Sequence, residues 1–190
     1  MKVKARPWFD PDEQMAAVCS DVSPHFKMDM DFNGLLLGVD LAAPLIGRLE
    51  QKYSNLAIVE SPIPQTDVAG NALLRQKIRS PIAMHIGNPP VMTAIREGVC
   101  DGFVIGGGVS RVLKDGILAE KAGMPFWLQM VGTGLTTTFA VHLGAVLEQA
   151  RWPAIPCINI YSNTLMENFS VEGGHVRVPQ EPGLGVELDR

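Results

Sequence analysis

Short apolar runs alternate with longer amphipathic segments along almost the whole chain, one pair for every ~20–30 residues. Segments of this kind are typical of a parallel sheet covered by helices. We count about seven strand–helix units, whose expected strands cover residues 1–6, 27–32, 55–60, 81–86, 102–105, 125–130 and 155–161. A whole (β/α)8 barrel usually needs ~250 residues, and the chain has 190. The sequence therefore predicts an α/β fold, an incomplete TIM-type (β/α)8 barrel that lacks its first strand.

Composition narrows the class of protein. Of the residues, 46% are hydrophobic and 19% charged, and the net charge is −4. Lys and Arg are dispersed, so we expect neither nucleic acid nor a membrane surface as a partner. Cys19, Cys100 and Cys157 lie far apart and form no CxxC pattern, which favours reduced thiols. We therefore expect a single domain, residues 1–190, in the cytoplasm.

The stretch KMDMDFNG, residues 27–34, places polar residues at alternate positions of an apolar strand. Asp29, Asp31 and Asn33 then share one face of that strand. Two carboxylates and an amide are costly to bury unless something binds them. Oxygen ligands suit a hard divalent cation such as Mg²⁺ or Mn²⁺. The alternative is a strand that runs into a polar turn at Asn33-Gly34.

Chemically active side chains also stand at the ends of successive expected strands. In a parallel barrel the active site lies at the carboxyl ends of the strands. Taken in chain order, these ends carry Lys4, Asp31 with Asn33, Glu60, His85, Gly106, Gln129 and Asn159. A lysine, two carboxylates and a histidine would meet at one mouth. The alternative is that each is a solvated strand end.

The runs that carry these residues resemble a known family. They are KVKARPWFDPDEQ, DMDFNG and IVESPIPQTDVAGNALLRQKIRSPIAMH, followed by GVCDGFVIGGG and VEGGHVRVPQEPGLGVELD near the other end. Together they are similar to the barrel domain of the enolase superfamily, in its mandelate racemase and muconate lactonizing branch. The resemblance covers nearly the whole chain. It implies a C-terminal barrel fragment or a truncated member, without the capping domain that closes over the substrate in that family.

The resemblance assigns a role to each matching residue. Lys2 and Lys4 match the KxK pair, in which Lys4 is the expected base, and Asp31 and Glu60 match two metal ligands. His85 stands where the third ligand is usually Asp or Glu. The implied cofactor is a divalent metal, Mg²⁺ or Mn²⁺, although histidine suits Zn²⁺, Mn²⁺ or Fe²⁺ better than Mg²⁺.

Two strand ends depart from the family pattern. The sixth commonly carries Asp or Lys, and Gly106 stands there. The seventh often carries the His of a second acid/base, and Gln129 stands nearest. We expect Asn33 and Gln129 to contact the substrate.

The implied chemistry is abstraction of a proton alpha to a carboxylate through an enediolate intermediate. The substrate would be a small hydroxy acid or sugar acid, and the outcome elimination, isomerisation or racemisation. Racemisation needs a second acid/base on the opposite face, so the departure at Gln129 favours a one-base elimination. The alternative function is a catalytically inactive fragment that is structural or requires a missing N-terminal part. An exposed sheet edge would favour association with a second copy.

Overall fold

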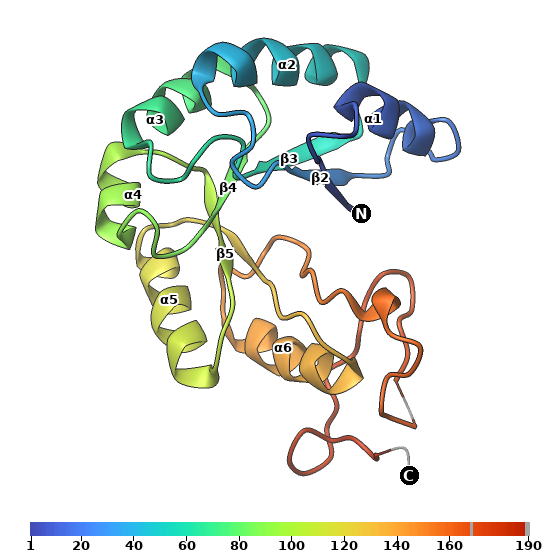
Figure 1. Cartoon of the computed structure of the whole chain (residues 1–190). Helices are drawn as coiled ribbons and strands as arrows, with labels where there is room; N and C mark the ends of the chain where they lie inside the picture. The colour runs from blue at the N-terminus through green and yellow to red at the C-terminus, as the bar shows by residue number, and fades with distance from the viewer. Residues whose placement is uncertain (168, 189–190) are drawn as a thin grey trace. The chain divides into compact units, whose positions relative to one another are not determined.

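The computed structural model describes residues 1–167 and 169–188, in which strands and helices alternate (Figure 1). The strands are β1 (Lys2–Lys4), β2 (Met28–Asp31), β3 (Leu56–Glu60), β4 (Ile82–His85), β5 (Gly102–Ile105) and β6 (Phe126–Leu128). The helices are α1 (Pro11–Cys19), α2 (Val39–Lys52), α3 (Val68–Lys77), α4 (Val91–Glu97), α5 (Val109–Lys121) and α6 (Gly134–Val146), with a short 3₁₀ helix, η1 (Ile158–Ile160). The strands form one sheet in sequence order, β1 to β6. This is the predicted α/β class, an incomplete (β/α)8 barrel.

Backbone contacts divide the chain into two compact units, Met1–Phe103 and Val104–Arg190. The first unit contains β1 to β4 and α1 to α4, and β5 contains the boundary. The second unit contains α5, β6, α6 and the segments that follow. Within the described residues, no helix is long and apolar enough to cross a membrane.

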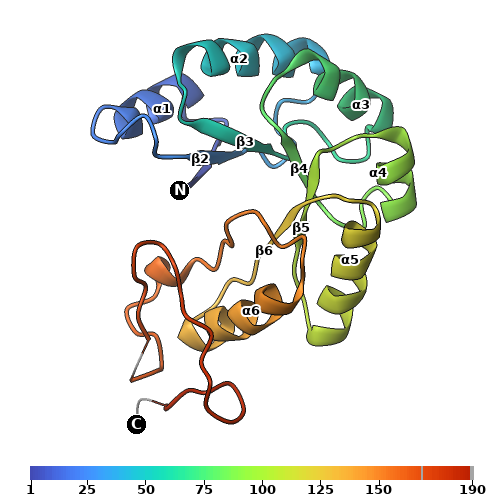
Figure 2. The same ribbon diagram turned by 180° about the vertical axis from the view of Figure 1, so that it is seen from behind.

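The register of the first unit aligns the carboxyl ends of its strands. β1, β2, β3 and β4 pair in parallel, with Lys4 opposite Asp31, Asp31 opposite Glu60, and Glu60 opposite Ala83. Every residue of β2 is buried, so both faces of this strand are covered. Figures 1 and 2 show α2 and α3 along one face of β2 to β4. The polar face of β2 must therefore point away from these helices, as expected for a barrel interior.

Aspartate side chains cap the beginnings of α1 and α3 in the first unit. Asp10 caps α1 by accepting a hydrogen bond from the Asp12 N–H at 2.8 Å. Asp67 caps α3 in the same way, with the Gly70 N–H at 2.9 Å. A carboxylate at this position satisfies an amide that has no partner inside the helix. Both capping residues are readable from the sequence.

The prediction of a seventh strand at residues 155–161 is wrong. Residues 158–160 form η1, and the structure has six strand–helix units rather than about seven among the described residues. Trp152 and Ile155 do donate backbone hydrogen bonds to Phe126 and Leu128 of β6, at 3.1 Å each. Within the predicted range, Pro156 has no N–H to donate and Cys157 adopts a left-handed backbone with φ +57°, which an extended strand does not contain. The segment therefore runs beside β6 without becoming a strand.

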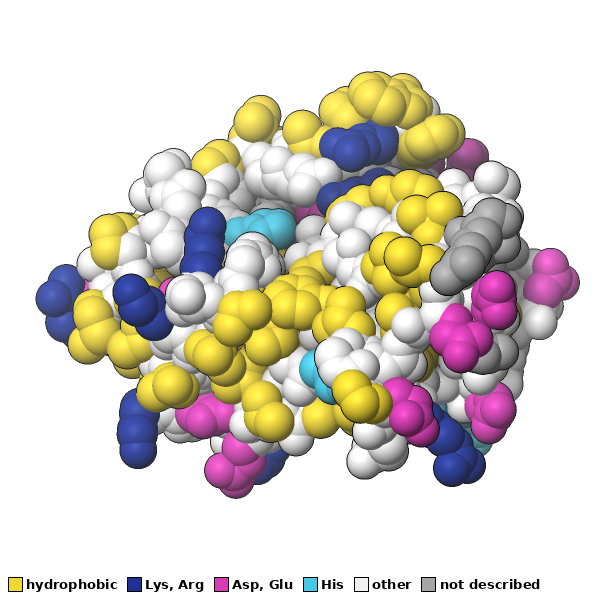
Figure 3. Space-filling model, turned by 90° about the horizontal axis from the view of Figure 1, so that it is seen from below, with side chains coloured by type: hydrophobic (Ala, Val, Ile, Leu, Met, Phe, Trp, Pro, Cys, Tyr) yellow, Lys and Arg dark blue, Asp and Glu magenta, His cyan; other side chains and the backbone are white. Residues whose placement is uncertain are grey.

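Surface charge agrees with the dispersed sequence pattern. On the face drawn in Figure 3, the described Lys and Arg side chains are scattered among apolar and acidic ones. They do not gather there into a basic patch of the kind that binds nucleic acid.

Candidate active site

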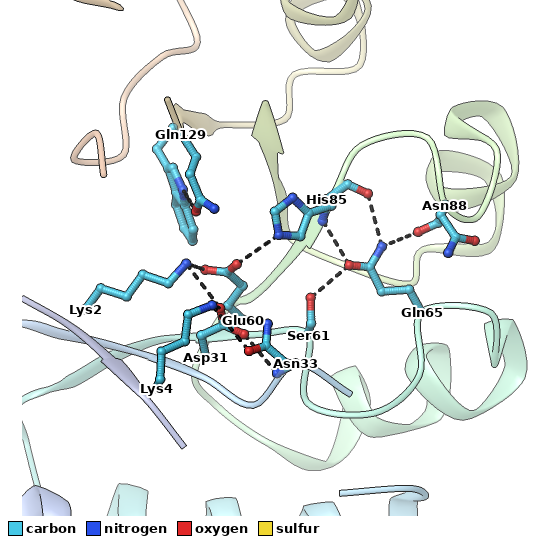
Figure 4. Close-up of polar contacts among 11 residues, drawn as sticks. Lys2, Lys4, Asp31, Asn33, Glu60, Ser61, Gln65, His85, Asn88 and Gln129 are labelled. Atoms are coloured by element: carbon cyan, nitrogen blue, oxygen red, sulfur yellow. Dashed lines mark hydrogen bonds and ion pairs between the residues drawn. The ribbon is translucent and has the colours of Figure 1, made fainter. Parts of the chain in front are cut away.

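The carboxyl ends of β1 to β4 bring five of the predicted residues together (Figure 4). Lys2 and Lys4 come from β1, Asp31 from the end of β2, Glu60 from the end of β3 and His85 from the end of β4. Parallel pairing in register places these positions side by side although they are up to 83 residues apart in sequence. The predicted convergence of Lys4, Asp31, Glu60 and His85 is confirmed as an arrangement. Their chemical roles remain predictions.

Lys4 is the accessible amine of the group. Its side chain is 42% exposed, and Nζ contacts Oδ2 of the fully buried Asp31. The same amine lies 3.3 Å from Oδ1 of Asn33, whose backbone N–H donates to Asp31 Oδ1 at 2.9 Å. Asn33 adopts a left-handed backbone, with φ +49°, which asparagine tolerates better than most residues. Asp31 and Asn33 therefore hold the Lys4 amine in place, while part of the Lys4 side chain stays exposed.

The side chain of Lys2 is largely buried and contacts the carboxylates of both Asp31 and Glu60. Its side chain is 9% exposed, and Nζ contacts Glu60 Oε2 and lies 3.2 Å from Asp31 Oδ2. Burial lowers the pKa of Lys2, but the charges of Glu60 and Asp31 outweigh it, so the net pKa lies above the ordinary value. The structure therefore makes Lys2 a fixed cation beside the two carboxylates.

Glu60 is held ionised by its neighbours. Burial raises its pKa, but the imidazole of His85 and the ammonium of Lys2 together bring the pKa down to about 2. His85 Nε2 lies 3.2 Å from Glu60 Oε1, and the His85 side chain is 49% exposed. His85 thus stands beside a carboxylate, as predicted, with one side of its ring open.

Gln65 is a residue of this site that the sequence interpretation missed. Its Oε1 accepts hydrogen bonds from Ser61 Oγ at 2.8 Å and from the His85 backbone N–H at 3.1 Å. Its Nε2 donates to the carbonyl oxygen of His85 at 3.1 Å and to that of Asn88. Gln65 therefore joins the end of β3 to the end of β4. The sequence signal for this residue is a glutamine that follows a proline-rich strand end, SPIPQ.

Asp29 lies one layer below Asp31 on the same face of β2. It pairs in register with Lys2 of β1, and it is 8% exposed. Neither of its carboxylate oxygens receives a hydrogen bond from the described residues. Burial, with the nearby charge of Glu60, raises the pKa of Asp29 to about 8. The alternating pattern of residues 27–34 counted Asp29 with Asp31 among the carboxylates offered to a divalent cation, whereas the family resemblance assigned no role to Asp29.

The carboxylates of Asp31 and Glu60 are chemically suited to bind a divalent cation. Asp31 and Glu60 offer fully buried carboxylates, and Glu60 Oε1 receives no hydrogen bond of good geometry from the described residues. Carboxylate oxygens are the ligands that Mg²⁺ and Mn²⁺ prefer. In residues 1–167 and 169–188, however, no three His, Cys, Asp or Glu side chains are already arranged to hold a metal ion. Metal binding would therefore require these side chains to turn.

Two further predicted strand-end positions belong to the second unit. Gln129 follows β6; its Oε1 lies 3.5 Å from Trp127 Nε1, and its backbone N–H donates to Ile105 at 2.8 Å. A Cβ on Gly106 would lie 2.5 Å from the carbonyl oxygen of Gln129. Glycine at position 106 is therefore required by the close approach of two backbones. The role of Gln129 in substrate binding stays a prediction.

Comparison with known proteins gives the family. The sequence model of the enolase C-terminal domain-like family matches residues 1–190. An N-succinylamino acid racemase from Amycolatopsis sp. is 30% identical over 98% of this chain and 52% of its own length. An o-succinylbenzoate synthase from Enterococcus faecalis is 24% identical over the whole chain and 53% of its own length. The chain thus spans about half the length of the curated relatives it matches.

Solved structures agree in fold. A mandelate racemase/muconate lactonizing family protein from Azoarcus sp. EbN1 superposes with a TM-score of 0.79 at 28% identity. That match covers 99% of this chain and 55% of the other. A dipeptide epimerase from Cytophaga hutchinsonii, solved with Mg and the dipeptide D-Ala-L-Val, has a TM-score of 0.83 at 19% identity, over 100% of this chain and 54% of the other. The chain belongs to the enolase superfamily, in its mandelate racemase and muconate lactonizing branch, and corresponds to part of the C-terminal barrel domain of that family.

Proposed function

We propose that this chain removes a proton from the carbon alpha to a carboxylate and passes through an enediolate, as a lyase or an isomerase. The observation that carries the proposal is the partly exposed side chain of Lys4 beside the buried carboxylate of Asp31, with the ammonium of Lys2 next to the same carboxylate. A proton-abstracting amine needs access to the substrate, and Lys4 has it while Lys2 does not.

The roles differ between the two lysines. Lys4 takes the proton, and Asn33 and Asp31 hold its amine in place. Lys2 stays charged and places a fixed positive charge beside the carboxylates of Asp31 and Glu60. Negative charge develops on the substrate carboxylate during this step, and preorganised positive charge stabilises it.

Asp31, Glu60 and His85 would hold a divalent cation, Mg²⁺ or Mn²⁺. When bound, the cation supplies positive charge to the enediolate. Gln65 fixes the backbone of His85 and so limits where its imidazole can go.

A cytoplasmic location and association with a second copy also stay predictions.

The relatives suggest which small carboxylates to try. Their names include N-succinylamino acid racemase, o-succinylbenzoate synthase and, at lower identity, muconate cycloisomerase. We therefore propose N-acylated amino acids as substrates beside hydroxy acids and sugar acids. Gly106 and Gln129 provide no second acid/base at the positions where the family resemblance expects one, which favours one-base elimination over racemisation.

A second candidate is a domain without catalytic activity. The observation in its favour is that the ammonium groups of Lys2 and Lys4 and the imidazole of His85 already contact the carboxylates of Asp31 and Glu60. Such a network is balanced in charge without any ligand. It would then hold the strand ends together rather than act on a substrate.

Exchange of the alpha proton tests the proposal directly. The whole chain is incubated in D₂O with Mg²⁺ and a panel of N-succinyl amino acids, hydroxy acids and sugar acids, and loss of the alpha-proton signal is followed by ¹H NMR. We expect exchange with at least one acid, and its loss in Lys4→Met. The matched control is Lys27→Met, because Lys27 is exposed and its amine bonds the Ser54 carbonyl oxygen instead. Exchange that survives Lys4→Met removes Lys4 from its role, and no exchange with any acid favours the second candidate.

A further inference from the structure

The carboxylate of Asp29 is buried beside Lys2 and Glu60 without a donor that satisfies its oxygens. It is 8% exposed, and neither oxygen receives a hydrogen bond from the described residues. An unpaired polar group of this kind costs free energy, and a charged one costs more. The other buried carboxylates of the first unit differ in this respect. Asp31 and Glu60 are ion-paired, and Glu50 accepts the backbone N–H groups of Arg79 and Ser80.

Asp29 points toward the carboxylates of the candidate active site. Alternation along β2 places it on the same face as Asp31, one layer down. Asp29 pairs in register with Lys2 of β1, whose Nζ contacts Glu60 Oε2 and lies 3.2 Å from Asp31 Oδ2. The three carboxylates therefore belong to one part of the first unit, and neither oxygen of Asp29 receives a hydrogen bond from the described residues.

We propose that Asp29 is a further ligand of the divalent cation that Asp31 and Glu60 bind. The inference rests on the metal site of the proposed function. It explains how a site with a histidine at the end of β4 can still favour Mg²⁺ or Mn²⁺. With Asp29, the site offers three carboxylates, and hard cations prefer oxygen to imidazole nitrogen.

The competing explanation is that Asp29 carries a proton and merely fills space beside Glu60. The two explanations differ for Asp29→Asn, because an amide has the shape of a protonated carboxyl group. If Asp29 is a neutral spacer, the amide replaces it without consequence for metal binding. If Asp29 is a ligand, the amide removes an anionic oxygen donor.

Calorimetric titration of the whole chain with Mn²⁺ at pH 7.5 makes the test. Four proteins are compared: the parent, Asp29→Asn, Asp31→Asn and Glu50→Gln. The last is the matched control, because Glu50 is a buried carboxylate of the same unit whose contacts are backbone N–H groups away from the site. Far-UV circular dichroism verifies that each variant is folded, and Asp29→Ala replaces Asp29→Asn if the latter is not.

We expect the Mn²⁺ dissociation constant to rise about tenfold or more in Asp29→Asn, since even groups that only support a ligand typically contribute that much. Glu50→Gln should bind like the parent, and Asp31→Asn should lose binding. Parent-like affinity in Asp29→Asn, with binding lost in Asp31→Asn, overturns the role of Asp29 and leaves the metal site of the proposed function intact. Absence of binding by the parent overturns both.

Discussion

Asp29→Asn should stabilise the metal-free protein, and the gain should grow as pH rises. The folded protein holds the proton on Asp29 up to a pKa of about 8, whereas an unpaired aspartate titrates at 3.8. Between these values the folded state binds more protons than the unfolded state, so the parent loses stability with increasing pH. An asparagine at position 29 has no titratable proton, so it causes no such loss of stability with increasing pH.

The magnitude follows from the span between the two pKa values. Each pH unit within it removes about 1.4 kcal/mol from the free energy of unfolding of the parent. The penalty therefore reaches about 4 kcal/mol at pH 7 relative to pH 4 and below. The charges of the neighbouring Lys2 and Glu60 act on Asp29 and change the size of this penalty. A loss of half the calculated free energy would therefore still support the reasoning.

Urea denaturation in the presence of EDTA measures this difference. Far-UV circular dichroism follows unfolding of the parent, Asp29→Asn and Glu50→Gln at several pH values between 5 and 8. The advantage of Asp29→Asn over the parent should widen steadily across this range, and Glu50→Gln should show no such trend. An advantage that does not change with pH, or a variant less stable than the parent at pH 8, refutes the reasoning.

Two further substitutions test how the backbone holds the strand ends, each by urea denaturation. Gly106→Ala should cost about 1–3 kcal/mol, because its Cβ would lie 2.5 Å from the carbonyl oxygen of Gln129. Gly47→Ala, inside α2 with nothing within 4 Å, should instead gain up to about 1 kcal/mol; equal effects would contradict the close approach. Gln65→Ala should cost about 0.5–1.5 kcal/mol, because it removes the exposed hydrogen bonds to the backbone N–H and C=O of His85, which water can replace in part. A neutral Gln65→Ala would show that β3 and β4 hold their ends without it.

The charge arrangement at the strand ends explains why the two lysines of KxK differ. Both lie on β1, but Lys2 is surrounded by carboxylates and Lys4 is open on one side. The two lysines therefore differ in exposure, and the proposed function assigns proton abstraction to the more exposed of the two.

Two helix caps and one strand of the candidate site could be predicted from local sequence. The capping residues Asp10 and Asp67 and the strand of alternating aspartates are each set by interactions a few residues apart. The prediction of a seventh strand failed because Pro156 has no backbone donor and Cys157 adopts a left-handed backbone, although the pattern of residues 155–161 is apolar. Gly106 was interpreted as a missing functional group, whereas the structure shows a close backbone contact that excludes any side chain.

By itself the sequence determined the alternation of strands and helices and the presence of Lys4, Asp31, Glu60 and His85 at successive strand ends. Both follow from periodicity, which is a property of neighbouring residues. The tertiary structure alone decided that Lys2 is buried, that Asp29 lacks a partner and that Gln65 joins two strands. These depend on the register between strands far apart in the chain, because burial and electrostatic interaction arise only where distant segments meet.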